Sequence, residues 1–368
     1  MSRAERRWSL GALLLLPGSV RAQAAHPAPS KLEIGEGIYL FQTAPYGDAG
    51  LDGNSVVIVT EEGVLVFDSN GTPAAAEAVL AEIRKITPAP IKYLVNSHWH
   101  WDHWYGAEVY KKAFPELQVI THERTRQLMA GPAVAFNQPG LDEQLPGHIA
   151  QLESQLLRAK VSATPVPGVA GLEAHLARDR WFLQQKRGVK HTLATITFSD
   201  SLTIHLGPRT IQVLHHDRAI TPGDTYLYLP KEKVLVMGDL LINPITFALF
   251  CYPTGWIKTL KALARLDAVV LVPGHGGPLA DKALLHATIA LLEREQQLAR
   301  EAKGRGENVD QAKATILADA RVLALRTTIT GSDARRNDAF ALYLVDWFVT
   351  RVYQELDGTL DDSIPRTP

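Results

Sequence analysis

The sequence predicts a layered α/β fold followed by a helical extension. Short runs of β-branched residues recur in the first part of the chain, and a segment with the composition of an amphipathic helix separates two of them. A strand, a helix and a further strand at this spacing are typical of helices packed on a sheet. From about residue 282 onward the pattern is helical.

The composition bounds the class of protein. Apolar residues make up 46% of the 368 residues and charged residues 21%, which suits a globular chain with a substantial core. The 38 basic and 39 acidic side chains nearly cancel, and no long basic run is present, so nucleic acid is not an expected partner. The single cysteine, Cys251, excludes an internal disulfide and a CxxC zinc site. Any metal must therefore be held by histidines and carboxylates.

Residues 1–24 have the pattern of a signal peptide. Three arginines precede the apolar stretch Leu10–Leu16, and Ala22-Gln23-Ala24 forms a small-residue cleavage site, so the mature chain should begin at Ala25. The Arg6-Arg7 pair also resembles a twin-arginine signal, and an ordinary secretion signal is an equally good interpretation. We expect a bacterial protein that is periplasmic or secreted. The apolar stretch is too short to span a bilayer, so no stable membrane insertion is expected.

In the part of the chain before His98, strands are expected, with one helix between two of them. A helix is expected over Ala74–Ile86, because that segment is rich in Ala, Glu, Leu and Lys. Glu61-Glu62-Gly63 supplies a turn between two of the strands. The expected strands are Gly37–Phe41, Asn54–Thr60, Gly63–Asp68 and Lys92–Asn96.

A helical insertion is expected over about 123–190, where helical composition is interrupted by Pro-Gly pairs. Strands then resume, a helix is expected over about Trp256–Leu266, and an apolar strand leads into Pro273-Gly274-His275-Gly276. The expected strands here are Thr195–Phe198, Leu202–Leu206, Arg209–Leu214, Thr225–Leu229, Lys233–Met237 and Ala268–Val272. The later helical segments lie around Leu285–Lys303, Val309–Ala324 and Asp338–Glu355.

Four potential metal ligands fall within six residues directly after the strand that ends at Asn96. They are His98, His100, Asp102 and His103. Alternation along an extended loop would place the first two on one side, while the last two would turn toward another point. That arrangement suits two cations a few ångströms apart.

The motif His98-x-His100-x-Asp102-His103 resembles the one that defines the metallo-β-lactamase superfamily. Further stretches agree in order: the hairpin that ends at Asp68, then 219–224, 237–240 and 273–276. The resemblance implies an α/β fold, a four-layer αββα sandwich, here with a helical insertion and a C-terminal helical extension. The implied domain covers 30–282, with the insertion at about 123–190, and the extension covers 283–368.

Carried over by this resemblance, Asp102, His103 and His275 would hold one zinc ion, and Asp239 would bridge toward a second. His98 and His100 would hold the second ion together with a histidine, but this chain has Ile220 at that position. Three outcomes stay open: His215 or His216 substitutes for the missing ligand, the second ion is held weakly with extra water, or only the first site fills. One or two Zn²⁺ ions are therefore expected.

The resemblance implies a hydrolase in which a metal-activated water attacks an ester, a lactam or a related bond of a small-molecule substrate. Asp102 is the catalytic candidate, because it could orient that water or take its proton. Asp68 would orient a ligand histidine. Two other classes remain open: an exported binding protein with a structural metal, and an iron-dependent oxidoreductase. The oligomeric state is not indicated.

Overall fold

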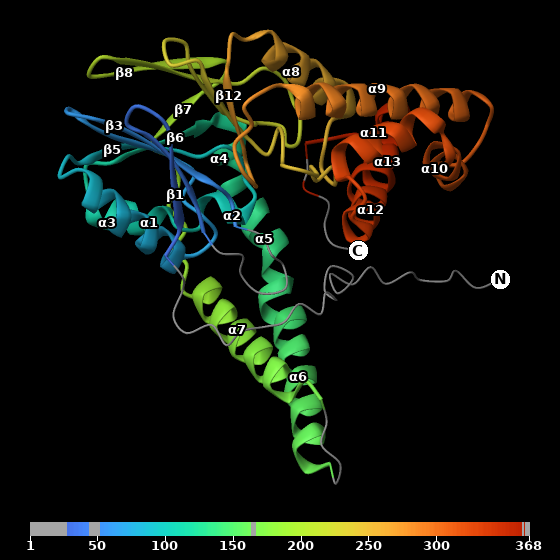
Figure 1. The fold of residues 1–368 in the computed structure, drawn as a ribbon, viewed down its shortest axis with the longest axis horizontal. Helices are drawn as coiled ribbons and strands as arrows, with labels where there is room; N and C mark the ends of the chain where they lie inside the picture. The colour runs from blue at the N-terminus through green and yellow to red at the C-terminus, as the bar shows by residue number, and fades with distance from the viewer. Residues whose placement is uncertain (1–27, 44–51, 163–166, 363, 365–368) are drawn as a thin grey trace.

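Two mixed β-sheets face each other in the computed structural model, and helices cover both outer faces (Figure 1). The structure describes residues 28–43, 52–162, 167–362 and 364. The predicted signal peptide and its cleavage site lie outside the described residues. The predicted four-layer αββα arrangement is confirmed, and so are the helical insertion and the helical extension.

The first sheet has seven strands in the order of the chain, and the second has the order β12-β11-β10-β9-β8. Strands β1 to β4 pair antiparallel, and β4 to β7 pair parallel. In the second sheet, only the β11–β12 pair is parallel. The first sheet consists of β1 (Ser30–Gly35), β2 (Ile38–Gln42), β3 (Ser55–Thr60), β4 (Gly63–Phe67), β5 (Ile91–Val95), β6 (Gln118–His122) and β7 (Ile196–Phe198). The second consists of β8 (Ser201–Leu206), β9 (Arg209–Leu214), β10 (Tyr226–Leu229), β11 (Val234–Gly238) and β12 (Val270–Pro273).

Strands β3 and β4 are buried on both faces, which explains their continuous apolar sequence. In β4, Leu65 and Phe67 face the space between the sheets, where they join the central apolar cluster. Val64 and Val66 alternate with them and face the outer helices. Strand β4 therefore contributes side chains to two of the three interfaces between the layers.

The helices α1 (Pro73–Ile86) and α3 (Ala107–Ala113) cover the outer face of the first sheet. Thr72 caps α1 by accepting a hydrogen bond from the backbone of Ala75, and Pro73 occupies the first helical turn. The short helix α2 (Trp101–Trp104) lies between them in sequence. Since α2 begins inside the predicted metal motif, its position decides where the ligands point.

The other outer face is covered by α8 (Pro253–Arg265), α9 (Ala283–Gly304) and the C-terminal helices, which share one large apolar cluster with the second sheet. The expected segment Val309–Ala324 is wrong as a single helix, because Asp319 ends one helix and caps the next through the backbone of Arg321 and Val322. Strands β1 and β6 were not predicted. The C-terminal elements are α10 (Val309–Ala318), α11 (Ala320–Thr330), α12 (Ala334–Phe340), η3 (Ala341–Asp346) and α13 (Trp347–Leu356).

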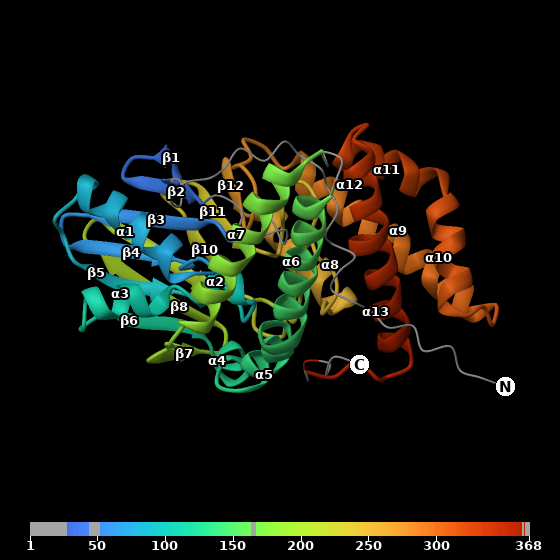
Figure 2. The same cartoon turned by 90° about the horizontal axis from the view of Figure 1, so that it is seen from below.

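The helical insertion forms a two-helix arm that extends away from the sandwich (Figure 1), and Figure 2, seen from below, shows the arm in front, between the sheets and the C-terminal helices. The arm consists of α6 (Leu145–Val161) and α7 (Val169–Arg187). It is reached through α4 (Glu123–Met129), α5 (Pro132–Pro139) and η2 (Gly140–Gln144). Within the described residues, no helix is both long enough and apolar enough to cross a membrane.

Candidate metal centre

The loop after β5 changes direction at His100, and this change separates the predicted ligands. Ser97 to His100 continue in an extended loop, and His100 precedes the first turn of α2 with extended backbone angles. Asp102 and His103 then lie on the helical turn, where consecutive side chains point about 100° apart. The sequence prediction of two diverging pairs is therefore explained by a short helix that starts inside the motif.

The second sheet supplies the remaining two predicted residues. Asp239 directly follows β11 and His275 follows β12 after one further residue, and these strands are parallel neighbours with Gly238 opposite Pro273. Both side chains therefore leave the sheet at the same edge. Gly274 has a specific role, because a Cβ there would overlap the Oδ1 atom of Asp239.

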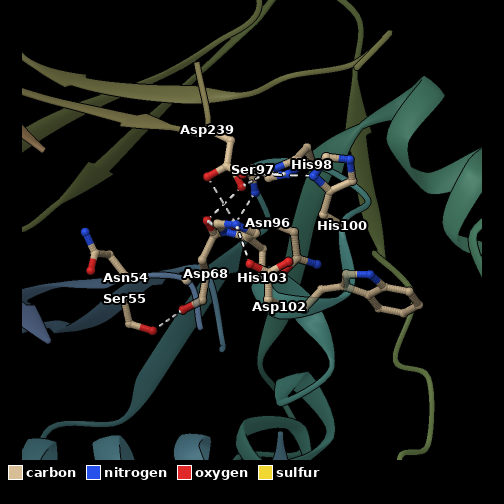
Figure 3. A network of polar contacts seen from close by, with 12 residues as sticks. Asn54, Ser55, Asp68, Asn96, Ser97, His98, His100, Asp102, His103 and Asp239 are labelled. Atoms are coloured by element: carbon tan, nitrogen blue, oxygen red, sulfur yellow. Dashed lines mark hydrogen bonds and ion pairs between the residues drawn. The ribbon is translucent and has the colours of Figure 1, made fainter. Parts of the chain in front are cut away.

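Four side-chain atoms converge at this edge (Figure 3 labels three of their four residues). His103 Nε2 lies 3.4 Å from Asp102 Oδ2 and 3.2 Å from Asp239 Oδ1. His275 Nε2 lies 3.1 Å from Asp102 Oδ2 and 3.4 Å from Asp239 Oδ1. Two atoms bound to a tetrahedral zinc ion at its usual bond lengths lie about 3.3 Å apart. The four separations are each close to this length. The ligand atoms of Asp102, His103 and His275 all lie within 4.8 Å of one another, and Asp239 forms a second such group with His98 and His103.

Buried nitrogen and oxygen atoms at this edge lack hydrogen-bond partners among the described residues. They are the Nε2 atoms of His98, His100 and His103 and the Oδ1 atom of Asp239. Burying a polar atom without a partner costs free energy, so such a group of convergent atoms indicates a ligand. Nitrogen and carboxylate donors together are the set that Zn²⁺ and related divalent cations prefer, so the residues fit a bound cation.

Asp68 fixes the orientation of His103. Its Oδ2 atom lies 2.8 Å from His103 Nδ1 and accepts a hydrogen bond from Ser97 Oγ, while its Oδ1 atom accepts one from the Ser97 backbone. The carboxylate thereby holds the proton of His103 on Nδ1 and leaves Nε2 to face Asp102 and Asp239. Asp68 has a φ of 60°, a strained angle for a residue with a side chain, which the three hydrogen bonds offset.

Charges at the edge shift the pKa values in a consistent direction. Burial opposes protonation of His103 and His275, but the surrounding carboxylates outweigh it and raise the pKa of His275 to about 10. Burial would raise the pKa of Asp102 and Asp239, but His103 and His275 hold both well below the usual range. In the absence of a cation, protons on the histidines neutralise the two carboxylates. A cation therefore has to displace these protons.

The second half of the predicted site is less complete. His98 Nε2 lies 3.6 Å from Asp239 Oδ2, and His100 Nδ1 lies 3.9 Å from the same oxygen. Asp239 thus directs Oδ1 toward His103 and His275, and Oδ2 toward His98 and His100. Ile220 is fully buried in the apolar cluster that the second sheet shares with the C-terminal helices, and it offers no donor atom.

The two histidines proposed as substitutes are held elsewhere. His215 Nδ1 lies 2.9 Å from the backbone oxygen of Asp224, and its ring contacts His122 with centroids 4.2 Å apart. His216 lines a pocket of about 750 Å³ between α8 and α9, on the helical side of the second sheet. In the arrangement described, neither supplies the missing ligand.

Aromatic side chains surround the histidine pair. Trp99 and Trp104 are buried, and Trp104 Nε1 donates to the Trp99 backbone oxygen. The ring of His100 lies 4.5 Å from that of Trp99, 5.6 Å from Phe250 and 6.4 Å from Phe247. The ring of Trp347 lies 4.5 Å from that of Phe247, so the C-terminal extension reaches this aromatic cluster. The helical periodicity of the C-terminal sequence could not predict this contact between Trp347 and Phe247.

Lys186 on α7 was also not anticipated from the sequence. It is buried, and its Nζ atom lies 3.2 Å from the ring centroid of Trp101 and 4.1 Å from that of Tyr105. This contact between an amine and two aromatic rings joins the arm to the helix that carries Asp102 and His103, and burial lowers the pKa of Lys186 well below its usual value. The base of the arm therefore belongs to the surroundings of the metal centre.

Comparison with known proteins settles the family. The sequence model described as the metallo-beta-lactamase superfamily matches residues 48–275. The chain belongs to this superfamily. The family prediction is thus confirmed.

Relatives in sequence and structure share the same core. The linear primary-alkylsulfatase of Pseudomonas sp. (strain ATCC 19151) is 26% identical over 238 residues, which cover 61% of this chain and 42% of that protein. The DIM-1 metallo-beta-lactamase has a TM-score of 0.50 at 18% identity, over 73% of this chain and 99% of its own. The sec-alkylsulfatase Pisa1 from Pseudomonas sp. has a TM-score of 0.59 at 18% identity, over 89% of this chain and 50% of its own. This chain therefore spans about half the length of the alkylsulfatases, or less.

Proposed function

We propose that this protein is a zinc-dependent hydrolase with one intact metal site, formed by Asp102, His103, His275 and Asp239. This proposal rests on the four separations of 3.1–3.4 Å between their ligand atoms. A zinc ion held there supplies Lewis acidity and lowers the pKa of a water to about 7. The fold contributes ligands from both sheets, and the Asp68 contact sets the tautomer of His103 in advance.

The residues of the incomplete half can serve the substrate. His98 and His100 direct nitrogen atoms toward Asp239 Oδ2, and with Ile220 in place of a third ligand they are available as hydrogen-bond donors or acceptors. Asp102 is the candidate to orient the attacking water or to accept its proton, because its Oδ2 atom lies within 3.4 Å of both His103 and His275. In this proposal, Asp102, His103, His275 and Asp239 hold the cation, and His98 and His100 contact the substrate.

The aromatic cluster beside His100 favours a substrate with an apolar part. The ring centroids of Trp99, Phe247 and Phe250 lie within 6.4 Å of that of His100, and the stacked pair of Tyr343 and Trp347 extends the apolar surface. Such a surface binds an alkyl group by removing its apolar area from water. The alkylsulfatase relatives support the same class. We therefore propose an ester of an apolar alcohol, with alkyl sulfates and carboxylic esters before lactams.

Metal content and hydrolysis should be measured together on the mature protein. At low free zinc we expect about one zinc ion per chain by mass spectrometry, bound at the sheet edge, lost in His275→Ala and retained in His98→Ala. Turnover should be assayed on alkyl sulfates of graded length, on nitrophenyl esters and on a lactam. His205→Ala, an exposed histidine on β8, is the matched control. Zinc binding to neither site, or turnover that survives His275→Ala, would exclude a one-metal hydrolase at this edge.

A second candidate function has one observation in its favour. Asp239 Oδ1 supplies a fourth protein atom to the intact site, and zinc sites closed by four protein ligands are usually structural. A protein that retains its zinc but hydrolyses none of the panel would be a binding protein of this fold. Iron in place of zinc in the isolated protein would support an oxidoreductase.

Export is proposed on the N-terminal sequence pattern alone. Expression in a bacterial host, fractionation and N-terminal sequencing test it directly. A periplasmic or secreted product that begins at Ala25 is the expected result. A cytoplasmic product that retains residues 1–24 would contradict it.

A further inference from the structure

A second cluster of histidines and a carboxylate lies on the arm. His148 on α6 and His175 and Asp179 on α7 have their ligand atoms within 4.8 Å of one another. The Nε2 atoms of the two histidines lie 3.5 Å and 3.2 Å from Asp179 Oδ2, and the ring centroids lie 5.5 Å apart. None of these residues takes part in the metal centre at the sheet edge.

The packing of the arm fixes this cluster in place. His175 and Asp179 are four residues apart, so they lie on one face of α7. Leu176 on α7 and Ile149 and Leu152 on α6 are buried together next to them, which sets the register of the two helices. The cluster is therefore built by the helix pair and does not depend on a loop.

The two oxygens of Asp179 have different surroundings. Arg178 Nε lies 3.5 Å from Oδ1, whereas both histidines face Oδ2. The Asp179 side chain is 3% exposed, while His148 and His175 are 28% and 21% exposed. The exposed parts of the two imidazoles are not their Nε2 atoms, which are buried like the carboxylate, so three buried donor atoms converge at one point.

We propose that His148, His175 and Asp179 bind a divalent cation of the zinc class and thereby clamp α6 to α7. The separations of 3.2 Å and 3.5 Å bracket the edge of a tetrahedral zinc site, which is about 3.3 Å. Two imidazoles and one carboxylate select zinc, copper or nickel over calcium and magnesium. The neighbouring guanidinium of Arg178 opposes a cation, so this site should fill at higher free zinc than the Asp102 site.

The clamp has a defined route to the rest of the protein. Lys186 lies seven residues after Asp179 on α7, about 10 Å along the helix axis. Its contact with Trp101 connects α7 to the turn that carries Asp102. A bound ion therefore stiffens the arm whose base packs against the metal centre.

The test compares zinc binding by the mature wild-type chain with His148→Ala, His175→Ala and Asp179→Asn, in buffered zinc. The wild type should bind one zinc beyond those held at the sheet edge, and each variant should weaken it at least about 10-fold. Hydrogen exchange provides a second measurement: amides of α6 and α7 should exchange more slowly with zinc in the wild type only. Because both histidines are partly exposed, the alanine variants should fold, and circular dichroism checks this.

Two controls separate this site from the sheet edge. His205→Ala should behave as the wild type does. His275→Ala should lose the sheet-edge zinc and keep the arm zinc together with its effect on exchange in α6 and α7. If His275→Ala abolishes all zinc binding, or if the arm variants match the wild type in affinity and exchange, the arm site is wrong whether or not the hydrolase proposal stands. An empty sheet edge with a filled arm would contradict the hydrolase proposal alone.

Discussion

Asp68→Asn should weaken zinc binding although it keeps the shape of the side chain. In the wild type, the Oδ2 atom of Asp68 accepts from both His103 Nδ1 and Ser97 Oγ, at 2.8 Å and 2.7 Å. An amide nitrogen at that position can only donate, so His103 would have to accept at Nδ1 and carry its proton on Nε2. That proton would occupy the direction of the cation. The substitution therefore removes one of the four ligand atoms in the favoured tautomer.

The magnitude follows from how such partners act in metal sites. Loss of the carboxylate that orients a ligand histidine typically lowers metal affinity about 10 to 100-fold, which is about 1.4–2.7 kcal/mol of binding free energy. The exposed charge on Asp267, paired with Lys233, offers a matched control in Asp267→Asn, which should leave the affinity unchanged. Chelator competition measures both variants. A folded Asp68→Asn protein with wild-type zinc affinity would refute the tautomer argument.

Three further predictions address the protons, the missing ligand and the substrate. Because the pKa of His275 is raised to about 10, its protonation stabilises the metal-free fold. This stabilisation is complete at pH values below 6.5, the ordinary pKa of histidine, and it is lost as the pH rises toward about 10. Chemical denaturation of the metal-free protein from pH 6 to pH 10 should show that loss, and His275→Gln should reduce the slope, while His103, whose pKa is also raised, keeps its own contribution. Ile220→His should raise the zinc content of the sheet edge toward two ions, measured at low free zinc. It should cost about 1–3 kcal/mol of unfolding free energy, because a polar ring enters an apolar cluster. Ile220→Leu is its control, and an unchanged zinc content would argue that the second site cannot form. Phe250→Ala should lower turnover of long-chain esters more than that of short-chain esters, and an equal loss for all chain lengths would show that the ring does not contact the alkyl part.

Much of the sandwich could be predicted because its signals are local. The strand that ends at Phe67 and the helix capped by Thr72 carry their own pattern of apolar residues, turn residues and caps. Strand β1 was missed because it is an exposed edge strand with little apolar pattern. The break at Asp319 was missed because the apolar periodicity continues through it, and only the capping role of the aspartate ends the helix.

The residues of the candidate site could be predicted from the sequence, but the way in which the fold brings them together could not. The spacing from His98 to His103 identified a metal motif, but the turn of α2 that separates its two halves depends on packing against Trp99 and Tyr105. Asp239 and His275 were assigned by resemblance alone, and only the parallel pairing of β11 with β12 explains why they meet. The position of His215 against His122 depends on contacts between distant segments, which no local pattern records.

The ligand set of the sheet edge draws on both ends of the sandwich domain. Asp102 and His103 follow a strand of the first sheet, and Asp239 and His275 follow strands of the second, so an ion bound there would crosslink two sheets that are consecutive in the chain. During synthesis, this crosslink cannot form until residue 275 has joined its strand. On the proposed function, a chain that stops before β12 would lack His275 and could not complete this metal site, even with its first sheet folded.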